Sequence, residues 1–375
     1  ENQGSNHPSV QSIMSHLGEL LTSTGRFDEA EILYRRMVES EFDLEPVQRL
    51  SIYTNLANLC RQMGRLEESL NWHRRVLDFA DELTDLDDSV MLATFNNLAG
   101  VCREMGRMDD AIHWYERAIN IVEKSEHPND SAALAAYNNL AGVYREAGRV
   151  TAAVHWYERG LRVVEMTNRP GDPVALSIYN GLASVYRQAG RFDEAVHWYE
   201  NGLRAAEMSG RQGTSAALTM CNSLAGVYRQ MKKSEKAIDC YYRALQIAEK
   251  GGRGNTRALL SSHNGLADLY RETGSNDKAI IWYEKALELA RSVFGPRSPQ
   301  TAVQISNLAD ILVVEKRLKE AESMLRRALG YVDSSPHSDS PVASRIRGAL
   351  AQILRETGRK AEADSVSSKN KFDAF

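Results

Sequence analysis

Residues 96–107 read NNLAGVCREMGR, residues 138–149 read NNLAGVYREAGR, and residues 180–191 read NGLASVYRQAGR. The three stretches lie 42 residues apart (96 to 138, 138 to 180), and their leucine belongs to a series that runs along almost the whole chain. The series is Leu17, Leu56, Leu98, Leu140, Leu182, Leu224, Leu266, Leu308 and Leu350. A fixed period of about 20 to 50 residues is typical of stacked repeats. We therefore expect one elongated domain whose long surface carries the function.

Composition excludes several other classes of protein. The chain has 375 residues and a formal net charge of −4, which argues against a general binder of nucleic acid or of a membrane surface. No run approaches about 18 apolar residues, so we expect no membrane span, and no segment resembles a signal peptide. The four cysteines form no CxxC motif. We expect an intracellular, cytoplasmic protein with buried, reduced thiols.

One repeat, residues 134–175, predicts two helices. Leu134, Tyr137, Leu140 and Tyr144 recur at spacings of three and four residues, which indicates an apolar stripe on a first helix. Gly148 follows and is expected to end this helix in a left-handed cap. Glycine takes the same place in most other repeats, at Gly25, Gly64, Gly106, Gly190, Gly274 and Gly358.

A second helix is predicted after the glycine. Ala153, Tyr157 and Leu161 make its inward stripe, and the segment MTNRPGDP at 166–173 ends it. A small residue recurs at the position of Ala153 and lets the two helices approach closely. It is alanine in most repeats: Ala111, Ala153, Ala195, Ala237, Ala279 and Ala321.

These residues resemble the tetratricopeptide repeat (TPR). The pattern is carried by Leu140, Ala141, Tyr144, Gly148, Ala153, Tyr157 and Gly160. The period of 42, the NNLA start and connectors such as FGPRSPQTA at 294–302 are similar to the kinesin light chain type. The resemblance implies an all-α, right-handed superhelical solenoid of about nine helix-turn-helix repeats, which binds ligands on its concave face.

The period predicts a single solenoid over residues 1–375. The expected repeats are 8–49, 50–91, 92–133, 134–175, 176–217, 218–259, 260–301, 302–343 and a capping repeat, 344–368. Residues 369–375 are expected to form a flexible tail.

Two polar ladders follow the first helices. Asparagine stands two residues before the repeat leucine, at Asn96, Asn138, Asn180, Asn222 and Asn264. Arginine stands five residues after it, at Arg61, Arg103, Arg145, Arg187, Arg229, Arg271 and Arg355. The two positions are seven residues apart, which is two helical turns, so they share a face.

Small residues stand between the two ladders, at Gly100, Gly142, Ser184 and Gly226, as the floor of a groove would require. Helices pack about 8–10 Å apart, and an extended peptide rises about 3.3 Å per residue, so roughly three ligand residues would pass each repeat. Asparagine amides can bond to peptide backbone, and arginine forks suit carboxylates. The sequence therefore predicts an adaptor or scaffold that holds an extended, acidic peptide along repeats two to seven.

The same ladders have a structural alternative. Asparagine can bond to the next repeat's backbone, and arginine can pair with Glu104, Glu146 or Glu272, so that both ladders only stabilise the stack. Close helix packing likewise competes with the groove as the reason for the small residues. A second functional reading is a binding-inert arm, or one that mediates self-association, in a larger signalling or transport protein.

Other chemistry finds little support in the sequence. No phosphate loop, GxSxG or HExxH motif is present, so we expect no enzyme activity, catalytic residue or cofactor. His113, His155 and His197 recur with the repeat, but ligands about 10 Å apart cannot share one metal ion, so no metal site is expected. Single-stranded nucleic acid is the rival ligand, yet the groove lacks the aromatic platforms that such binding normally uses.

Overall fold

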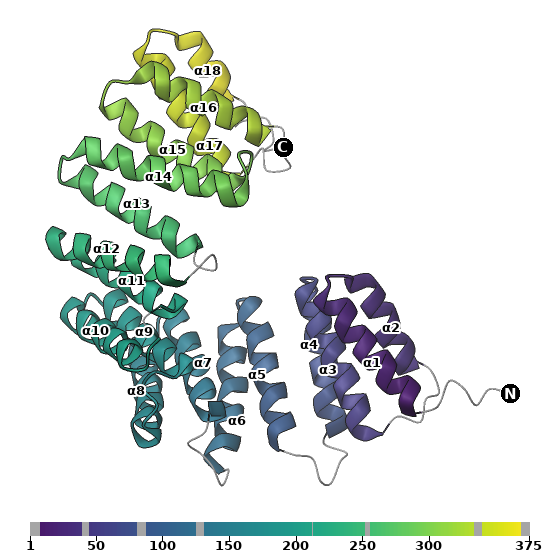
Figure 1. The fold of residues 1–375 in the computed structure, drawn as a ribbon. Coiled ribbons are helices and arrows are strands. Elements are labelled where there is room, and N and C mark those ends of the chain that lie inside the picture. The colour runs from purple at the N-terminus through teal and green to yellow at the C-terminus, as the bar shows by residue number, and fades with distance from the viewer. Residues whose placement is uncertain are drawn as a thin grey trace. The chain divides into compact units, whose positions relative to one another are not determined.

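The computed structural model describes residues 8–39, 45–80, 88–124, 131–211, 213–251, 256–333 and 340–368. These residues form eighteen helices and no strand, which confirms the all-α prediction. Within each of the two compact units described below, consecutive helices pair into hairpins (Figure 1). The expected tail at 369–375 lies outside the described residues. None of the described helices is long and apolar enough to cross a bilayer.

The chain divides into two compact units, residues 1–185 and 186–375, and the boundary falls inside α9 (Pro173–Gln188). One solenoid across this boundary stays a prediction of the sequence. The first unit contains α1 (Pro8–Ser23), α2 (Phe27–Glu39), α3 (Pro46–Gln62), α4 (Leu66–Ala80), α5 (Asp88–Glu104), α6 (Met108–Lys124), α7 (Ser131–Glu146) and α8 (Val150–Thr167).

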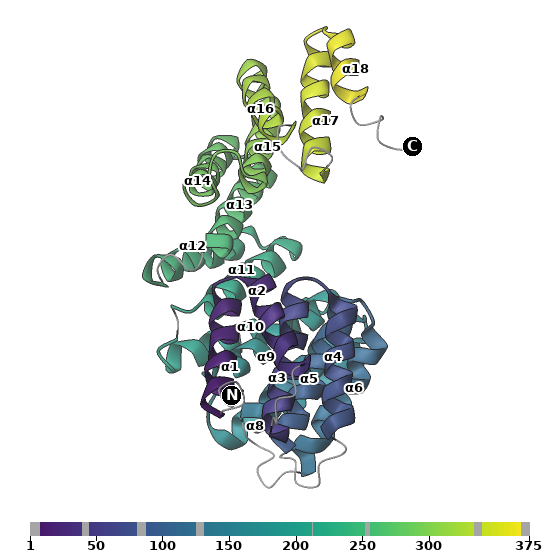
Figure 2. The same cartoon turned by 90° about the vertical axis from the view of Figure 1, so that its right-hand side faces the viewer.

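The second unit begins with the last turn of α9 and ends with a short hairpin, α17 and α18, whose helices lie side by side (Figure 2). Its helices are α10 (Phe192–Met208), α11 (Ser215–Gln230), α12 (Ser234–Gly251), α13 (Thr256–Glu272), α14 (Asn276–Phe294), α15 (Pro299–Val314), α16 (Leu318–Asp333), α17 (Pro341–Glu356) and α18 (Lys360–Ser368).

The repeat residues form the core as predicted. The series leucines from Leu56 to Leu350 are buried, and Ala111, Ala153 and the equivalent alanines are completely buried between the two helices of their hairpins. Leu17 differs, with 44% of its surface exposed, because no described hairpin precedes α1. Burial of the large side chains drives stacking, since one amphipathic helix cannot cover its apolar stripe alone.

Each hairpin turns at a residue in the left-handed conformation. Gly148, with a φ of 70°, donates its N–H to the carbonyl of Arg145, and the N–H of Arg149 reaches the carbonyl of Tyr144 at 2.8 Å. This pair of bonds satisfies the last carbonyls of the first helix. Two hairpins keep the turn without glycine, because Lys232 and Lys316 have φ values of 58° and 61°.

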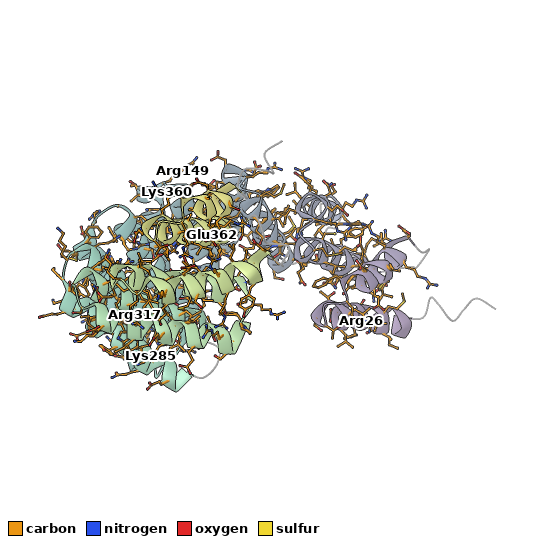
Figure 3. All side chains as sticks on the ribbon, turned by 90° about the horizontal axis from the view of Figure 1, so that it is seen from above. Arg26, Arg149, Lys285, Arg317, Lys360 and Glu362 are labelled. Carbon is orange, nitrogen blue, oxygen red and sulfur yellow. The ribbon has the colours of Figure 1, made fainter. Side chains whose placement is uncertain are left out.

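An arginine that follows the left-handed turn residue bonds to a carboxylate and stabilises the start of the second helix. Arg26 bonds to Glu29 at 2.6 Å, and Arg317 bonds to Glu320 at 2.9 Å, three residues further on in each case. Arg149 instead reaches Asp109 of the preceding hairpin at 2.6 Å. Figure 3 labels these three arginines.

One hairpin of the first unit carries a histidine where its neighbours have an aromatic core residue. His73 of α4 takes the place of Tyr115 and Tyr157 and is fully buried. Neither ring nitrogen has a hydrogen-bond partner among the residues that the structure describes. Burial lowers the pKa of His73 to about 4, and Arg61 adds to this effect. The ring is therefore neutral in the folded protein at pH 7.

The left-handed lysines predict a stabilising substitution. Lys232→Gly and Lys316→Gly should each raise the free energy of unfolding by about 1 kcal/mol, because glycine adopts a positive φ without the strain that a Cβ brings. Urea unfolding followed by circular dichroism measures the change. Gly190→Lys is the matched control and should destabilise the protein; a stabilised Gly190→Lys variant would contradict this account of the turn.

Buried His73 predicts acid sensitivity. The unfolded chain takes up a proton at this ring near its ordinary pKa of 6.5, whereas the folded state resists protonation down to about pH 4. The neutral His73 ring therefore does not reduce the free energy of unfolding above pH 6.5. Between pH 6.5 and about pH 4, the free energy of unfolding should fall by roughly 3 kcal/mol because of this residue. His73→Phe should flatten this part of the profile in denaturant unfolding at several pH values. An unchanged slope would show that His73 does not cause it.

His263 requires a separate comparison. Burial also lowers its pKa to about 4, with Lys285 as the lesser cause, so it should contribute acid sensitivity of the same sign. A His73→Phe/His263→Phe variant should therefore have a flatter profile than either single variant.

Candidate functional site

A hollow of about 480 Å³ opens on the first-helix face of the second unit. It is bordered by the end of α9 and by α11 and α13, the first helices of consecutive hairpins, of which α11 and α13 contact one another. The lining residues are Arg187 from α9, Ser215, Thr219, Asn222, Ser223 and Gly226 from α11, and Arg257, Ala258 and Ser261 from α13. The lining thus holds two guanidinium groups, an amide and four hydroxyls, and no carboxylate.

Two ladder residues, Arg187 and Asn222, line this hollow, but they differ in their hydrogen bonds. The Nδ2 atom of Asn222 donates to the carbonyl of Ala258 at 2.9 Å, and its Oδ1 atom accepts from the hydroxyl of Ser262 at 2.7 Å. These bonds tie α11 to α13. Asn222 therefore acts mainly as a structural link, as the alternative reading of the ladder proposed.

The small residues on this face have different surroundings in different repeats. A Cβ built on Gly100 would lie 3.3 Å from both terminal nitrogens of Arg61, so that guanidinium group already covers the glycine. A Cβ on Gly226 would meet no atom within 4 Å. Close packing therefore accounts for the small residue at Gly100, whereas Gly226 leaves open space in the floor of the hollow.

Three of the seven ladder arginines are engaged by a carboxylate of the next hairpin. Arg61 reaches Glu104 at 2.5 Å, and Arg103 reaches Glu146 at 2.7 Å. Arg229 makes the same contact with Glu272 at 2.5 Å. In each pair the glutamate lies 43 residues after the arginine.

The paired arginines keep their positive charge but offer little of it to a ligand. The hydrogen bond that Arg103 donates to Glu146 raises the pKa of Arg103, and the bond that Arg229 donates to Glu272 raises the pKa of Arg229. The carboxylates neutralise this part of the face and occupy donor atoms that an acidic peptide would need.

Arg187 lacks these counter-ions. Arg229 also reaches Asp268 at 3.4 Å, so two acidic residues of the next hairpin surround it. The equivalent positions around Arg187 hold Gly226 and Gln230. Within the described part of the second unit, neither Arg187 nor Arg257 forms an ion pair, so their charges are available in the hollow.

The remaining ladder residues lie outside the hollow. Arg145 is half-buried and lies 3.5 Å from Glu146 of its own helix, and Arg271 lies 3.7 Å from Asp268. The amides of the other hairpins are half-buried on their first helices, at Asn96, Asn138, Asn180 and Asn264. The buried Oδ1 atom of three of them, Asn96, Asn180 and Asn264, accepts no hydrogen bond within the described residues.

The ladders did not predict Arg257 or Ser223. Arg257 lies in the first turn of α13, where the equivalent residues are Ser131, Pro173 and Ser215, so it departs from the repeat pattern. That departure was the available signal in the sequence. Ser223 replaces the glycine found at Gly181 and Gly265 and contributes a hydroxyl to the lining.

A second hollow of about 510 Å³ lies in the first unit and has another character. Asn55, Asn58 and Gln62 line it together with Glu19, and no arginine contributes. Its charge does not suit an anion. Among the described residues, no group of three or more His, Cys, Asp or Glu side chains is placed so that it could hold a metal ion.

Comparison with known sequences identifies the repeat. Profiles described as tetratricopeptide repeat match residues 48–124, 90–166, 131–208, 214–292 and 258–330, and a related one matches residues 10–40. No curated protein matches the chain at a significant level. Solved structures that resemble it include kinesin light chain-like repeat proteins.

Three solved structures show the same fold at low identity. The TPR-sensor STAND ATPase PH0952 from Pyrococcus horikoshii has 18% identity and a TM-score of 0.59, with 92% of this chain and 52% of that chain covered. The quorum sensor NprR from B. thuringiensis has 15% identity and a TM-score of 0.55, with 96% and 97% covered. BtubC from P. vanneervenii has 20% identity and a TM-score of 0.53, with 63% and 92% covered.

The profile matches extend over more than half of the sequence and fall on the helical hairpins that the structure contains. Repeats of this kind generally mediate protein–protein interactions. This chain belongs to the tetratricopeptide repeat family.

Proposed function

We propose that this protein is an adaptor or scaffold that binds an extended, acidic segment of a partner protein along its first-helix face. The observation that carries the proposal is the hollow beside Arg187 and Arg257. Its guanidinium groups have no carboxylate near them in the lining, unlike the paired arginines of the other hairpins. Arg187 is half-buried and Arg257 is exposed. A half-buried cation without a counter-ion favours an anionic ligand, because the ligand supplies the missing charge.

The dimensions of the hollow suit a stretched chain. Its lining on α11 runs from Ser215 to Gly226, about 16 Å along the helix axis at about 1.5 Å per residue. About five residues of an extended peptide lying along α11 span that length at about 3.3 Å each, whereas a peptide that crosses the first helices passes each repeat with about three residues. Asn264 of α13, in the same unit as the hollow, would bond to the backbone of that peptide. Asn96, Asn138 and Asn180 belong to the first unit, and we propose the same role for them on the first-helix face of that unit.

The inert-arm reading makes a different prediction about the same face. A structural arm gains nothing from leaving Arg187 unpaired, since an intramolecular glutamate would neutralise it, as Glu272 neutralises Arg229. Self-association would instead use exposed apolar surface, of which Ile13, Leu17 and Leu20 on α1 are an example. The positive charge of the hollow therefore favours binding of an acidic segment from another protein over the inert-arm reading. We also place the protein in the cytoplasm, consistent with its four free cysteines.

Removing the two unpaired charges should reduce the preference of the protein for acidic peptides over uncharged ones. We expect Arg187→Gln/Arg257→Gln to weaken binding of acidic peptides by about tenfold or more, because each lost guanidinium removes charge-assisted hydrogen bonds. Fluorescence anisotropy against a library of short peptides rich in Asp and Glu measures this. The same library with Asn and Gln in their place is the uncharged reference.

The matched control for that experiment is Arg229→Gln, which removes an arginine of the same ladder that is already paired with Glu272. Its effect on peptide binding should be small. Equal losses in both variants would mean that a general positive field attracts the peptide, and unchanged affinity in the double variant would remove the hollow as the binding site.

Gly226 allows stability and binding to be separated. Gly226→Ala should raise the free energy of unfolding by about 0.5–1 kcal/mol, because alanine is the better helix former and its methyl group meets no atom. The same methyl group enters the floor of the hollow and should weaken peptide binding several-fold. A variant that is both more stable and equally competent to bind would show that the ligand does not approach this floor.

A further inference from the structure

The proposed function leaves open how the acidic residues of the bound segment are arranged. The two arginines of the hollow that form no ion pair belong to different hairpins. Arg187 comes from the last turn of α9 and Arg257 from the first turn of α13, and α11 belongs to the hairpin between them. Their positions along α11 therefore determine which peptide can contact both.

The register of the repeats places Arg187 beside the C-terminal part of α11. In the following hairpin, the equivalent Arg229 reaches Glu272, 43 residues later, at 2.5 Å. The residue 43 positions after Arg187 is Gln230, near the end of α11. Gly226 lies one turn before Gln230 and is the last residue of α11 that lines the hollow. Arg187 therefore marks this end of the hollow.

Arg257 marks the opposite end. It stands 42 residues after Ser215, the first residue of α11, and α11 and α13 contact one another. Side chains on a helix lean towards its N-terminus, so Arg257 extends towards the start of the hairpin. The lining from Ser215 to Gly226 is about 16 Å long at about 1.5 Å per residue. One acidic group cannot contact two guanidinium groups at this separation, so each needs an acid of its own.

The two arginines also enter from opposite sides of α11, because one belongs to the preceding hairpin and the other to the following hairpin. Successive side chains of an extended peptide point to opposite sides, so residues an odd number of positions apart face opposite sides. About five positions cover 16 Å at about 3.3 Å each, and five is an odd number. A separation of four or six would direct both acids to the same side.

We propose that the hollow selects a partner segment in which two acidic side chains stand about five positions apart. The segment would lie along α11 in extended form, with one acid at Arg187 and the other at Arg257. This inference rests on the proposed function and adds a spacing requirement to it. The residues between the two acids would pass Thr219, Asn222 and Ser223, which are polar but uncharged, so the middle of the segment needs no further acid.

Moving one cation supplies a sharp variant. Ser261 also lines the hollow and lies one turn after Arg257 on α13, about 6 Å nearer to Arg187 along the helix axis. The exchange Arg257→Ser/Ser261→Arg therefore relocates the charge without changing the composition or the net charge of the protein. The preferred separation of the two acids should shorten by about two positions, from five to three, which keeps them on opposite sides.

A second variant blocks one end while it keeps every arginine. Gln230→Glu places a glutamate 43 residues after Arg187, as Glu272 stands 43 residues after Arg229. The new carboxylate should engage Arg187 and remove the preference for any separation. Glu272→Gln is the matched control: it makes the reverse exchange in the following hairpin, leaves the lining unchanged and should keep the preference.

The experiment measures binding of short peptides to the full chain by fluorescence anisotropy. All peptides share one composition of Ser, Thr and Gly with two Glu residues, and only the separation of the two Glu residues varies. A separation of five should bind about tenfold tighter than a separation of two, four or six, because only that peptide bonds to both guanidinium groups. The relocated variant should prefer a separation of three, with circular dichroism confirming intact helices in every variant.

The outcomes separate the two proposals. Equal affinity at every separation, or an optimum at four or six, would overturn the spacing requirement and leave the acidic-peptide adaptor standing. An optimum that stays at five after the charge has been relocated would also overturn it, because Arg257 would then not be the second contact. Failure of every acidic peptide to bind would overturn both proposals.

Discussion

The close approach of the two helices in each hairpin is the constraint on which the structure depends. Completely buried alanines such as Ala153 allow it, and the buried leucines of the first helices fix how far one hairpin is displaced from the next. Because this packing repeats, a surface position of one hairpin faces an equivalent position of the next hairpin. The arginine–glutamate pairs 43 residues apart are a direct result of that fixed displacement.

A repeated surface becomes a specific site only where the repetition fails. Arg187 belongs to the same series as Arg229, but Gly226 and Gln230 replace the two acids that engage its counterpart. Arg257 is a second departure, in the first turn of α13. Both lie on one hollow, so the irregular positions of adjacent hairpins combine into a local positive site on a face that is elsewhere largely neutralised.

Much of the fold could be predicted from the sequence, because the same pattern of apolar, small and glycine residues recurs in each repeat. The left-handed glycines, the buried alanines and the face shared by the two ladders all follow from helical periodicity applied to one repeat. The partners of the ladder residues do not follow from it. Whether Asn222 turns to a ligand or to the carbonyl of Ala258 depends on the offset between neighbouring first helices, and only the coordinates define that offset.

Residue 230 is glutamine, whereas the equivalent residues Glu104, Glu146 and Glu272 of other hairpins are glutamate. This difference has a consequence for how such proteins diverge. The side chain lies on the surface, so its replacement disturbs none of the buried leucines or alanines. A stack of hairpins can therefore acquire, lose or relocate an anion-sensitive position through exchanges between two nearly isosteric residues, while its architecture stays unchanged. Proteins with almost superimposable backbones can in this way respond to different partners.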